Sequence, residues 1–133
     1  MNLELNNFSY TSTITTKTVK PKNINQLRNS VKKKHTVSGS RRSYGDSFIG
    51  KYLNISMSNF NKILHFDKKK GIIEVQSGVI LDKINKNIIP KGFILDCSPG
   101  CKYVSVGGMI SNNISGKLSK KNTISSKVIS IKI

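Results

Sequence analysis

Two loops rich in glycine and serine are the most informative feature of this sequence. The first loop, residues 38–47, reads Ser-Gly-Ser-Arg-Arg-Ser-Tyr-Gly-Asp-Ser, and the second segment, residues 98–116, contains a Ser-Pro-Gly turn and a Gly-Gly pair. Small residues let a ligand approach the backbone closely, and the N–H groups of such loops can surround an anion. The sequence therefore predicts short structural elements that hold two candidate binding loops, with ordinary Gly/Ser turns as the alternative.

Local patterns predict two helices. Asn23 can cap a helix whose apolar residues, at positions 24, 27 and 31, share one face, and the lysines at 32–34 suit the negative end of its dipole. A second amphipathic helix is expected from Ile80 to Ile89, because its isoleucines and leucine recur at helical spacing and Pro90 follows.

Short β-prone segments lie between and after these helices. The expected strands are residues 35–38, 52–56, 63–66, 72–76 and 128–133. Residues 67–71 are expected to form a turn that joins strands 63–66 and 72–76 into a hairpin, with Gly71 available for a positive φ. Residues 1–18 are polar and rich in Ser and Thr, so we expect a loose arm with one extended segment, followed by a domain from 19 to 133. This mixture of elements is typical of the α+β class.

The charge of the chain is strongly positive. Its 23 cationic and 6 acidic side chains give a formal net charge of +17. Such a charge favours polyanions in general, and a small basic nucleic-acid-binding protein is one alternative. However, the only arginines are Arg28, Arg41 and Arg42, and the aromatic residues are not interleaved with cations on one face. No specific nucleic-acid partner is therefore expected.

Several other classes of protein are excluded by simple features. No apolar stretch is long enough to span a bilayer, and no secretory signal opens the chain. Cys97 and Cys101 are the only cysteines, and their spacing does not fit a zinc site. We expect two free thiols, no metal and a cytoplasmic location. A Walker-type phosphate loop is also absent, because no Gly-Lys pair with the required spacing precedes Ser or Thr.

Taken together, the two loops and the hairpin between them resemble the N-terminal part of flavin-linked oxidases of the vanillyl-alcohol oxidase type, which carry a PCMH-type FAD-binding domain. Within that group the chain looks most like the decaprenylphosphoryl-ribose oxidase branch. The stretches that carry the likeness are residues 19–23, 43–46, 53–56, 61–67, 71–79, 90–93, 98–100 and 104–110. They span most of residues 19–133, and their occurrence in one order is more specific than either loop alone.

The resemblance implies an α+β fold in which two α+β subdomains clasp non-covalently bound FAD. It also implies an FAD-dependent oxidoreductase that oxidises a sugar or sugar-lipid hydroxyl by hydride transfer to flavin. The diphosphate would be bound by Ser38, Gly39, Ser40, Arg41, Arg42, Ser43, Tyr44, Gly45, Asp46 and Ser47. The adenine–ribityl part would be lined by Gly100, Ser105, Val106, Gly107 and Gly108. The isoalloxazine would be approached by Asn112, Asn113, Ile114 and Ser115, and a substrate phosphate by Lys117.

The sequence also departs from the family pattern. Ser38 replaces an arginine of the family loop, and Arg41 replaces a glycine, which is costly if that position requires a positive φ. Ser115 replaces a histidine, so a histidyl–flavin bond at this position is impossible. Nothing in the 133 residues corresponds to the rest of the FAD domain or to the substrate cap.

The resemblance therefore implies an incomplete, apparently truncated domain that is inactive by itself, with a complementing chain as a possible partner. Two alternatives stay within this family, an aldonolactone oxidase-type fragment and a nonfunctional remnant. No catalytic residue is assigned in this stretch.

Overall fold

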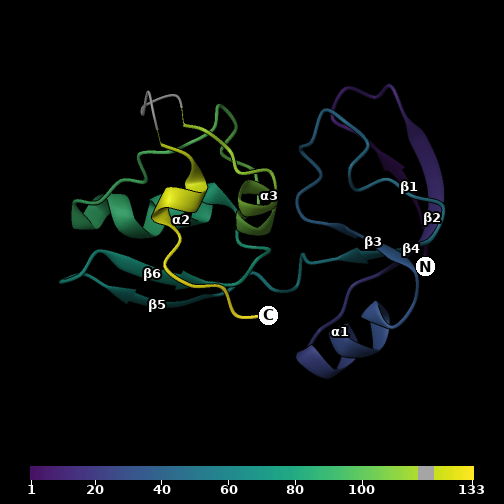
Figure 1. Ribbon diagram of the computed structural model, residues 1–133, viewed down its shortest axis with the longest axis horizontal. Helices are drawn as coiled ribbons and strands as arrows, with labels where there is room; N and C mark the ends of the chain where they lie inside the picture. Colours follow the sequence, from purple (N-terminus) through teal and green to yellow (C-terminus); the bar gives the residue numbers. More distant parts are fainter. Residues whose placement is uncertain (117–121) are drawn as a thin grey trace.

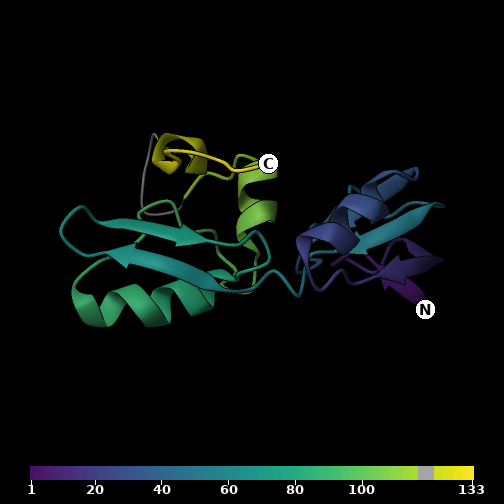
Figure 2. The ribbon, with the colours of Figure 1, turned by 90° about the horizontal axis from the view of Figure 1, so that it is seen from below.

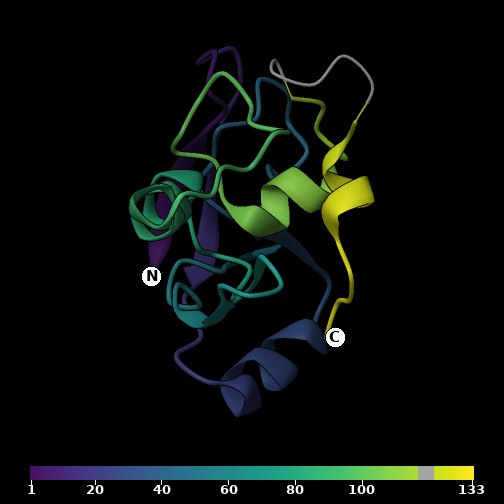
Figure 3. The same cartoon turned by 90° about the vertical axis from the view of Figure 1, so that its left-hand side faces the viewer.

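The computed structural model describes residues 1–116 and 122–133, and these form two lobes joined between β4 and β5 (Figure 1). The first lobe contains β1 (Asn2–Asn6), β2 (Thr13–Val19), α1 (Ile24–Val31), β3 (His35–Ser38) and β4 (Leu53–Ser56). The second contains β5 (Ile63–Asp67), β6 (Ile72–Val75), α2 (Leu81–Ile88), the 3-10 turn η1 (Ile89–Lys91), α3 (Val106–Ser111) and the 3-10 turn η2 (Ile124–Lys127). The N-terminus lies in the first lobe and the C-terminus in the second (Figures 1 and 3). The mixed α+β class predicted from the sequence is confirmed.

The first lobe is built on a four-stranded sheet in the order β1-β2-β4-β3. β4 is parallel to both of its neighbours, and β1 is antiparallel to β2. Leu5, Phe48 and Ile55 are buried in this lobe together with polar Asn54. Because β3 and β4 run in parallel, the first loop begins at the carboxyl end of β3 and returns to the opposite end of the sheet.

The N-terminal residues differ from the loose arm that we expected. β1 and β2 form an antiparallel hairpin in the same sheet as β3 and β4, and Leu5 is almost fully buried. β2 is rich in threonine, a β-branched residue that suits a pleated surface, and Thr16 and Thr18 are buried. The polar composition concealed these strands, although Leu3 and Leu5 alternate with polar residues as in a half-buried strand.

The second lobe packs α2 against the β5–β6 hairpin (Figure 2). Ile84 and Ile88 of α2 are buried with Val79, and hairpin residues such as Phe66 and Ile73 pack on them. Another buried group lies beside α3 and η2 and consists of Leu81, Cys97, Met109 and Ile124. The lobe therefore has two adjoining apolar clusters.

Most of the predicted elements are confirmed, with boundaries shifted by one or two residues. Asn23 caps α1, because its side-chain oxygen accepts a hydrogen bond from the N–H of Gln26 at 2.9 Å. α2 ends before Pro90, and Gly71 takes a φ of 65° in the hairpin turn. α1 itself ends at Val31, so Lys32 is its C-cap and the next two lysines lie beyond the helix.

The expected strand at residues 128–133 is wrong. These residues have no regular secondary structure, and Ile129 and Ile131 are 74% and 59% exposed. Alternating apolar residues are a local signal, whereas a strand also requires a neighbouring strand to hydrogen-bond with. Among the described residues no strand pairs with this segment. No helix in the described part of the chain is long and apolar enough to cross a membrane.

Both cysteines are free thiols in different environments. Cys97 is fully buried in the cluster beside α3, and Cys101 is half-buried. Burial, with a smaller contribution from the Asp96 carboxylate, raises the pKa of the Cys97 thiol. Cys97 therefore has the properties of an inert core residue.

We expect Ellman's reagent to modify Cys101 in the native chain and Cys97 only after unfolding. The Cys97 thiol is both inaccessible and disfavoured as a thiolate, whereas Cys101 is partly exposed. The measurement is the time course of thiol release without and with denaturant, and a Cys101→Ser variant should lack the fast phase. Equal rates for the two native thiols would contradict the packing of this cluster.

Candidate functional site

The first loop lies between the two lobes. It leaves β3 at Ser38, faces α3 of the second lobe, and returns to β4 (Figure 1). The backbone N–H groups of residues 39–47 donate no hydrogen bond within the described part of the chain. A run of unpaired donors next to two arginines is suited to an anion, because each N–H contributes partial positive charge without a competing partner.

Asn54 holds the two ends of the first loop together. It is fully buried, and its side-chain oxygen accepts a 2.8 Å hydrogen bond from the Ser38 hydroxyl. Its amide nitrogen donates to the carbonyl of Phe48 at 3.2 Å and to the hydroxyl of Thr36 at 3.2 Å. Sequence reasoning missed Asn54, because a single asparagine in a strand gives no local signal for such a role.

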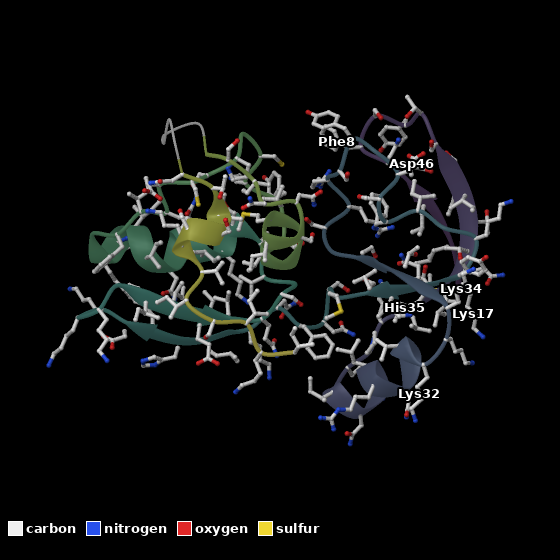
Figure 4. All side chains as sticks on the ribbon, viewed as in Figure 1. Phe8, Lys17, Lys32, Lys34, His35 and Asp46 are labelled. Atoms are coloured by element: carbon white, nitrogen blue, oxygen red, sulfur yellow. The ribbon has the colours of Figure 1, made fainter. Side chains whose placement is uncertain are left out.

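The β1–β2 hairpin braces the tip of the first loop (Figure 4). The side-chain amide of buried Asn7 donates to the carbonyl of Tyr44 at 3.1 Å and to the carboxylate of Asp46 at 3.0 Å. The hydroxyl of Ser12 donates to the other Asp46 oxygen at 2.8 Å. Asp46 thus serves as an acceptor that fixes the loop. Asn7 and Ser12 were not among the predicted site residues.

Ring contacts link the β1–β2 hairpin to the first loop, and the first loop to the second lobe. The rings of Phe8 and Tyr44 meet edge to face with centroids 5.2 Å apart. The Arg42 guanidinium lies 5.8 Å from the centre of the Phe8 ring and 5.9 Å from that of Tyr103, which belongs to the second lobe. Arg42 therefore stands between the lobes, at a distance where cation–π attraction acts.

Arg41 occupies a strained conformation. Its φ is 55°, in the left-handed region that favours glycine. The position that carries glycine in the resembling family therefore does require a positive φ in this chain. Arg41 keeps its guanidinium exposed beside the first loop at this conformational cost.

The second segment meets the first loop at Ser105. This residue is buried and caps α3, its hydroxyl accepting from the N–H of Gly108 at 3.4 Å. A Cβ atom built on Gly39 would overlap the Ser105 hydroxyl, so only glycine allows this approach without a shift. The two predicted loops are therefore in direct contact, although they lie far apart in sequence.

The backbone amides at the start of α3 are used inside the protein. The N–H of Gly107 donates to the carbonyl of Ser77 at 2.7 Å, and that of Val106 donates to the carbonyl of Val79 at 2.8 Å. The N–H of Gly108 donates to the Ser105 hydroxyl that caps the helix. Gly107 also lies close to Ser77, where a Cβ would come within 3.2 Å. Gly107 therefore allows α3 to pack against the turn before α2, and its own donor is used in this packing.

The residues that follow α3 connect it to η2. Asn112 donates to the carbonyl of Gly108 at 2.8 Å, and the Asn113 side chain accepts from the N–H of Ser125 at 3.3 Å. The carbonyl of Ile114 accepts a hydrogen bond from the N–H of Ile124, and Ser115 pairs with Thr123 in an isolated β-bridge. Gly100 is exposed in its turn, and Lys117 lies outside the described residues.

A cavity of about 300 Å³ lies where the lobes meet. Gly39, Ser40 and Ser58 line it from the first lobe, and Gly78, Ile80 and Lys83 from the second. The Lys83 ammonium donates to the carbonyl of Asn61 at 2.6 Å on its wall. Ser58, Gly78 and Lys83 were missed by sequence reasoning, since no motif marks them. In the described residues no group of three His, Cys, Asp or Glu side chains could hold a metal ion.

Comparison with known families identifies the domain. The family described as "FAD binding domain" matches residues 16–133. The chain belongs to this family. The cofactor of the domain is FAD, and the PCMH-type fold expected from the resemblance is confirmed. The match begins after most of the β1–β2 hairpin, so Asn7 and Ser12 lie outside it.

Curated relatives and solved structures agree with this assignment. The chain is 39% identical over 80 residues to the decaprenylphosphoryl-beta-D-ribose oxidase of Mycolicibacterium smegmatis (59% of this chain and 17% of the relative). It is 35% identical over 83 residues to a D-lactate dehydrogenase of Anaerostipes hadrus (61% and 18%). The chain thus spans about a fifth of the length of these relatives. Cholesterol oxidase of Brevibacterium sterolicum superimposes with a TM-score of 0.75 at 16% identity (87% of this chain and 24% of that one), which shows the shared fold.

Replacing Arg41 with glycine should stabilise the chain. Glycine removes the cost of the positive φ, so we expect the free energy of unfolding to rise by about 1 kcal/mol. Denaturant titration measures the change. Arg41→Ala is the matched control, because it removes the same charge at the same position but keeps the Cβ that makes the positive φ costly. An equal gain in both variants would assign the effect to charge.

Replacing Asn7 with leucine should loosen the tip of the first loop. The variant removes the hydrogen bonds to Tyr44 and Asp46, together with those to Thr11 and Ser12 inside the hairpin turn, at a cost of about 1–3 kcal/mol. We expect a lower melting temperature and faster hydrogen exchange of the Phe8 N–H, which donates to the carbonyl of Ser43 at 3.0 Å. Asn2→Leu is the control, because Asn2 is exposed at the start of β1. Unchanged exchange in Asn7→Leu would contradict the bracing.

Proposed function

We propose that this chain forms the diphosphate-binding part of the FAD site in an FAD-dependent oxidoreductase that oxidises a hydroxyl of a sugar or sugar-lipid. The observation that carries the proposal is the run of unpaired N–H groups at residues 39–47, placed between the lobes beside a cavity. The proposal extends the family assignment from the domain to the residues and to the reaction.

The residues present fit the cofactor. The two FAD phosphates require several donors, and the first loop offers its backbone from Ser38 to Ser47 with Arg41 and Arg42 beside it. Gly100 and residues 105–108 would line the adenine–ribityl part. Because the amides of Val106 and Gly107 are already used, this segment would contribute by close backbone approach rather than by donation. Residues 112–115 would approach the isoalloxazine.

The proposed reaction divides between the cofactor, which accepts the hydride, and the protein, which binds the cofactor. FAD, when bound, accepts the hydride from the carbon that bears the substrate hydroxyl. This chain's residues bind and orient the cofactor, and none of them is assigned as a catalytic base. With serine at position 115, binding at that position would be non-covalent. Lys117 is proposed to contact a phosphate of the substrate.

The names of the relatives support two substrate classes. A sugar-derived hydroxyl is favoured by the ribose oxidase and by a putative D-arabinono-1,4-lactone oxidase of Neurospora crassa, 22% identical over 121 residues. A 2-hydroxy acid is the second candidate, supported by the D-lactate dehydrogenase and by D-2-hydroxyglutarate dehydrogenases such as that of Arabidopsis thaliana, 33% identical over 63 residues. We favour the sugar class because of the higher identity to the ribose oxidase.

The rest of the catalytic apparatus is proposed to come from outside these residues. The matched stretches make up only 18% and 17% of the D-lactate dehydrogenase and the ribose oxidase. A complementing chain or a continuation of the same polypeptide would supply the remaining flavin contacts and the substrate pocket.

The test is an FAD titration followed by flavin fluorescence, with gel filtration and a visible spectrum of the retained protein. We expect saturable binding by the chain and at least about tenfold weaker binding by Gly39→Val. The added side chain would overlap Ser105 and separate the first loop from the second segment. Asn2→Val is the control, because it introduces the same side chain at an exposed residue outside both loops.

Circular dichroism must show that all three proteins are folded. A folded chain with no saturable FAD binding would overturn the assignment of the first loop. Equal affinity in the Gly39→Val and Asn2→Val variants would overturn the importance of the Gly39–Ser105 contact.

A further inference from the structure

A second cavity, of about 420 Å³, lies within the first lobe. Its walls are β2, the C-terminal end of α1 and the residues that lead into β4. β3 and β4 begin at this end of the sheet, since His35 pairs with Leu53, whereas the first loop leaves from the other end at Ser38. The cavity is therefore separate from the one proposed to bind FAD.

The lining of this cavity is basic. Lys17, Lys33 and Lys51 come from its three different walls, and no Asp or Glu lines it. Glu4 is the nearest carboxylate in the register of the sheet, opposite Thr15, but it forms no ion pair within the described residues. We call these three residues the cavity lysines. None of the three forms an ion pair with a described carboxylate.

Polar neighbours hold two of the walls in place. The Lys34 ammonium donates to the Tyr52 hydroxyl at 2.8 Å and lies 4.2 Å from the centre of the Tyr52 ring, and buried Thr16 donates to the carbonyl of Tyr52. The carbonyl of Lys33 is bonded to the His35 ring at 2.6 Å. Figure 4 shows Lys17, Lys34 and His35 at this side of the lobe. The backbone around the cavity lysines is thus fixed before any ligand arrives.

The α1 helix does not account for this charge. A helix C-terminus carries about half a negative charge, so lysines at 32–34 would be favourable there without a ligand. Lys17 and Lys51, however, come from β2 and from the segment before β4, outside the helix. The helix dipole therefore does not explain two of the three cavity lysines.

We propose that this cavity binds a small phosphate-bearing anion with several charges, of the diphosphate or triphosphate class. Lysine binds phosphate as a compact point charge, and three of them match an anion of three or more charges better than a single carboxylate. Thr15 and Asn29 also line the cavity, and their hydroxyl and amide groups can donate to phosphate oxygens. The site does not depend on FAD binding.

The test is calorimetric titration of the full chain with inorganic triphosphate at physiological salt. We expect saturable binding at one site, and at least about tenfold weaker binding when the three cavity lysines are changed together to glutamine. The matched control is Lys68→Gln, Lys69→Gln and Lys70→Gln in the hairpin turn. It lowers the net charge by the same amount on an exposed surface, so its affinity should stay close to that of the wild type.

An equal loss of affinity in both triple variants would show general attraction to a basic chain and overturn the site. The absence of saturation in a folded wild-type chain would also overturn it. Adding FAD should leave the triphosphate affinity unchanged, and competition would place the anion in the first loop instead. Sedimentation with vesicles containing phosphatidic acid tells whether the phosphate belongs to a lipid headgroup or to a free anion. Vesicle binding that requires the cavity lysines would assign the lipid headgroup. No vesicle binding would assign the free anion.

Discussion

The close approach of Gly39 to Ser105 is the contact on which the candidate FAD site depends. It brings the first loop, which belongs to the sheet of the first lobe, against the N-terminus of α3 in the second. Without it the unpaired amides of residues 39–47 and the inter-lobe cavity would not share one location. The absence of a Cβ at Gly39 therefore allows the two lobes to meet closely at this site.

The rest of the site follows from how backbone hydrogen bonds are distributed. Asn54 fixes the ends of the first loop and Asn7 its tip, so the loop keeps its shape through side chains while its own N–H groups stay available. The second segment behaves differently, because its amides bond to Ser77 and Val79 and stabilise packing. One loop is thus built to donate to a ligand, and the other to shape the space beside it.

The positive charges of the chain lie in different environments across its surface. The lysines at 68–70 lie in an exposed turn, and Lys86 and Lys102 form ion pairs with Asp82. The cavity lysines instead line one cavity and form no ion pair with a described carboxylate. Net charge is a property of composition, but the field at one point depends on which residues the fold brings together. The composition therefore said little about anion sites until the positions of the lysines were known.

The sequence by itself determined the elements whose signals are local. The Asn23 cap, the Gly71 turn, α2 and the β5–β6 hairpin are specified by residues within a few positions of one another, and the motif order was enough to indicate the FAD-binding family. Only the tertiary structure decided which segments pair and which donors remain free. β2 joins the sheet of β3 because β4 lies between them. Residues 128–133 are not a strand because no described strand lies beside them, and the Gly107 amide is occupied because the carbonyl of Ser77 faces it. A hydrogen bond requires two partners, and sequence patterns describe only one of them when the other lies far along the chain.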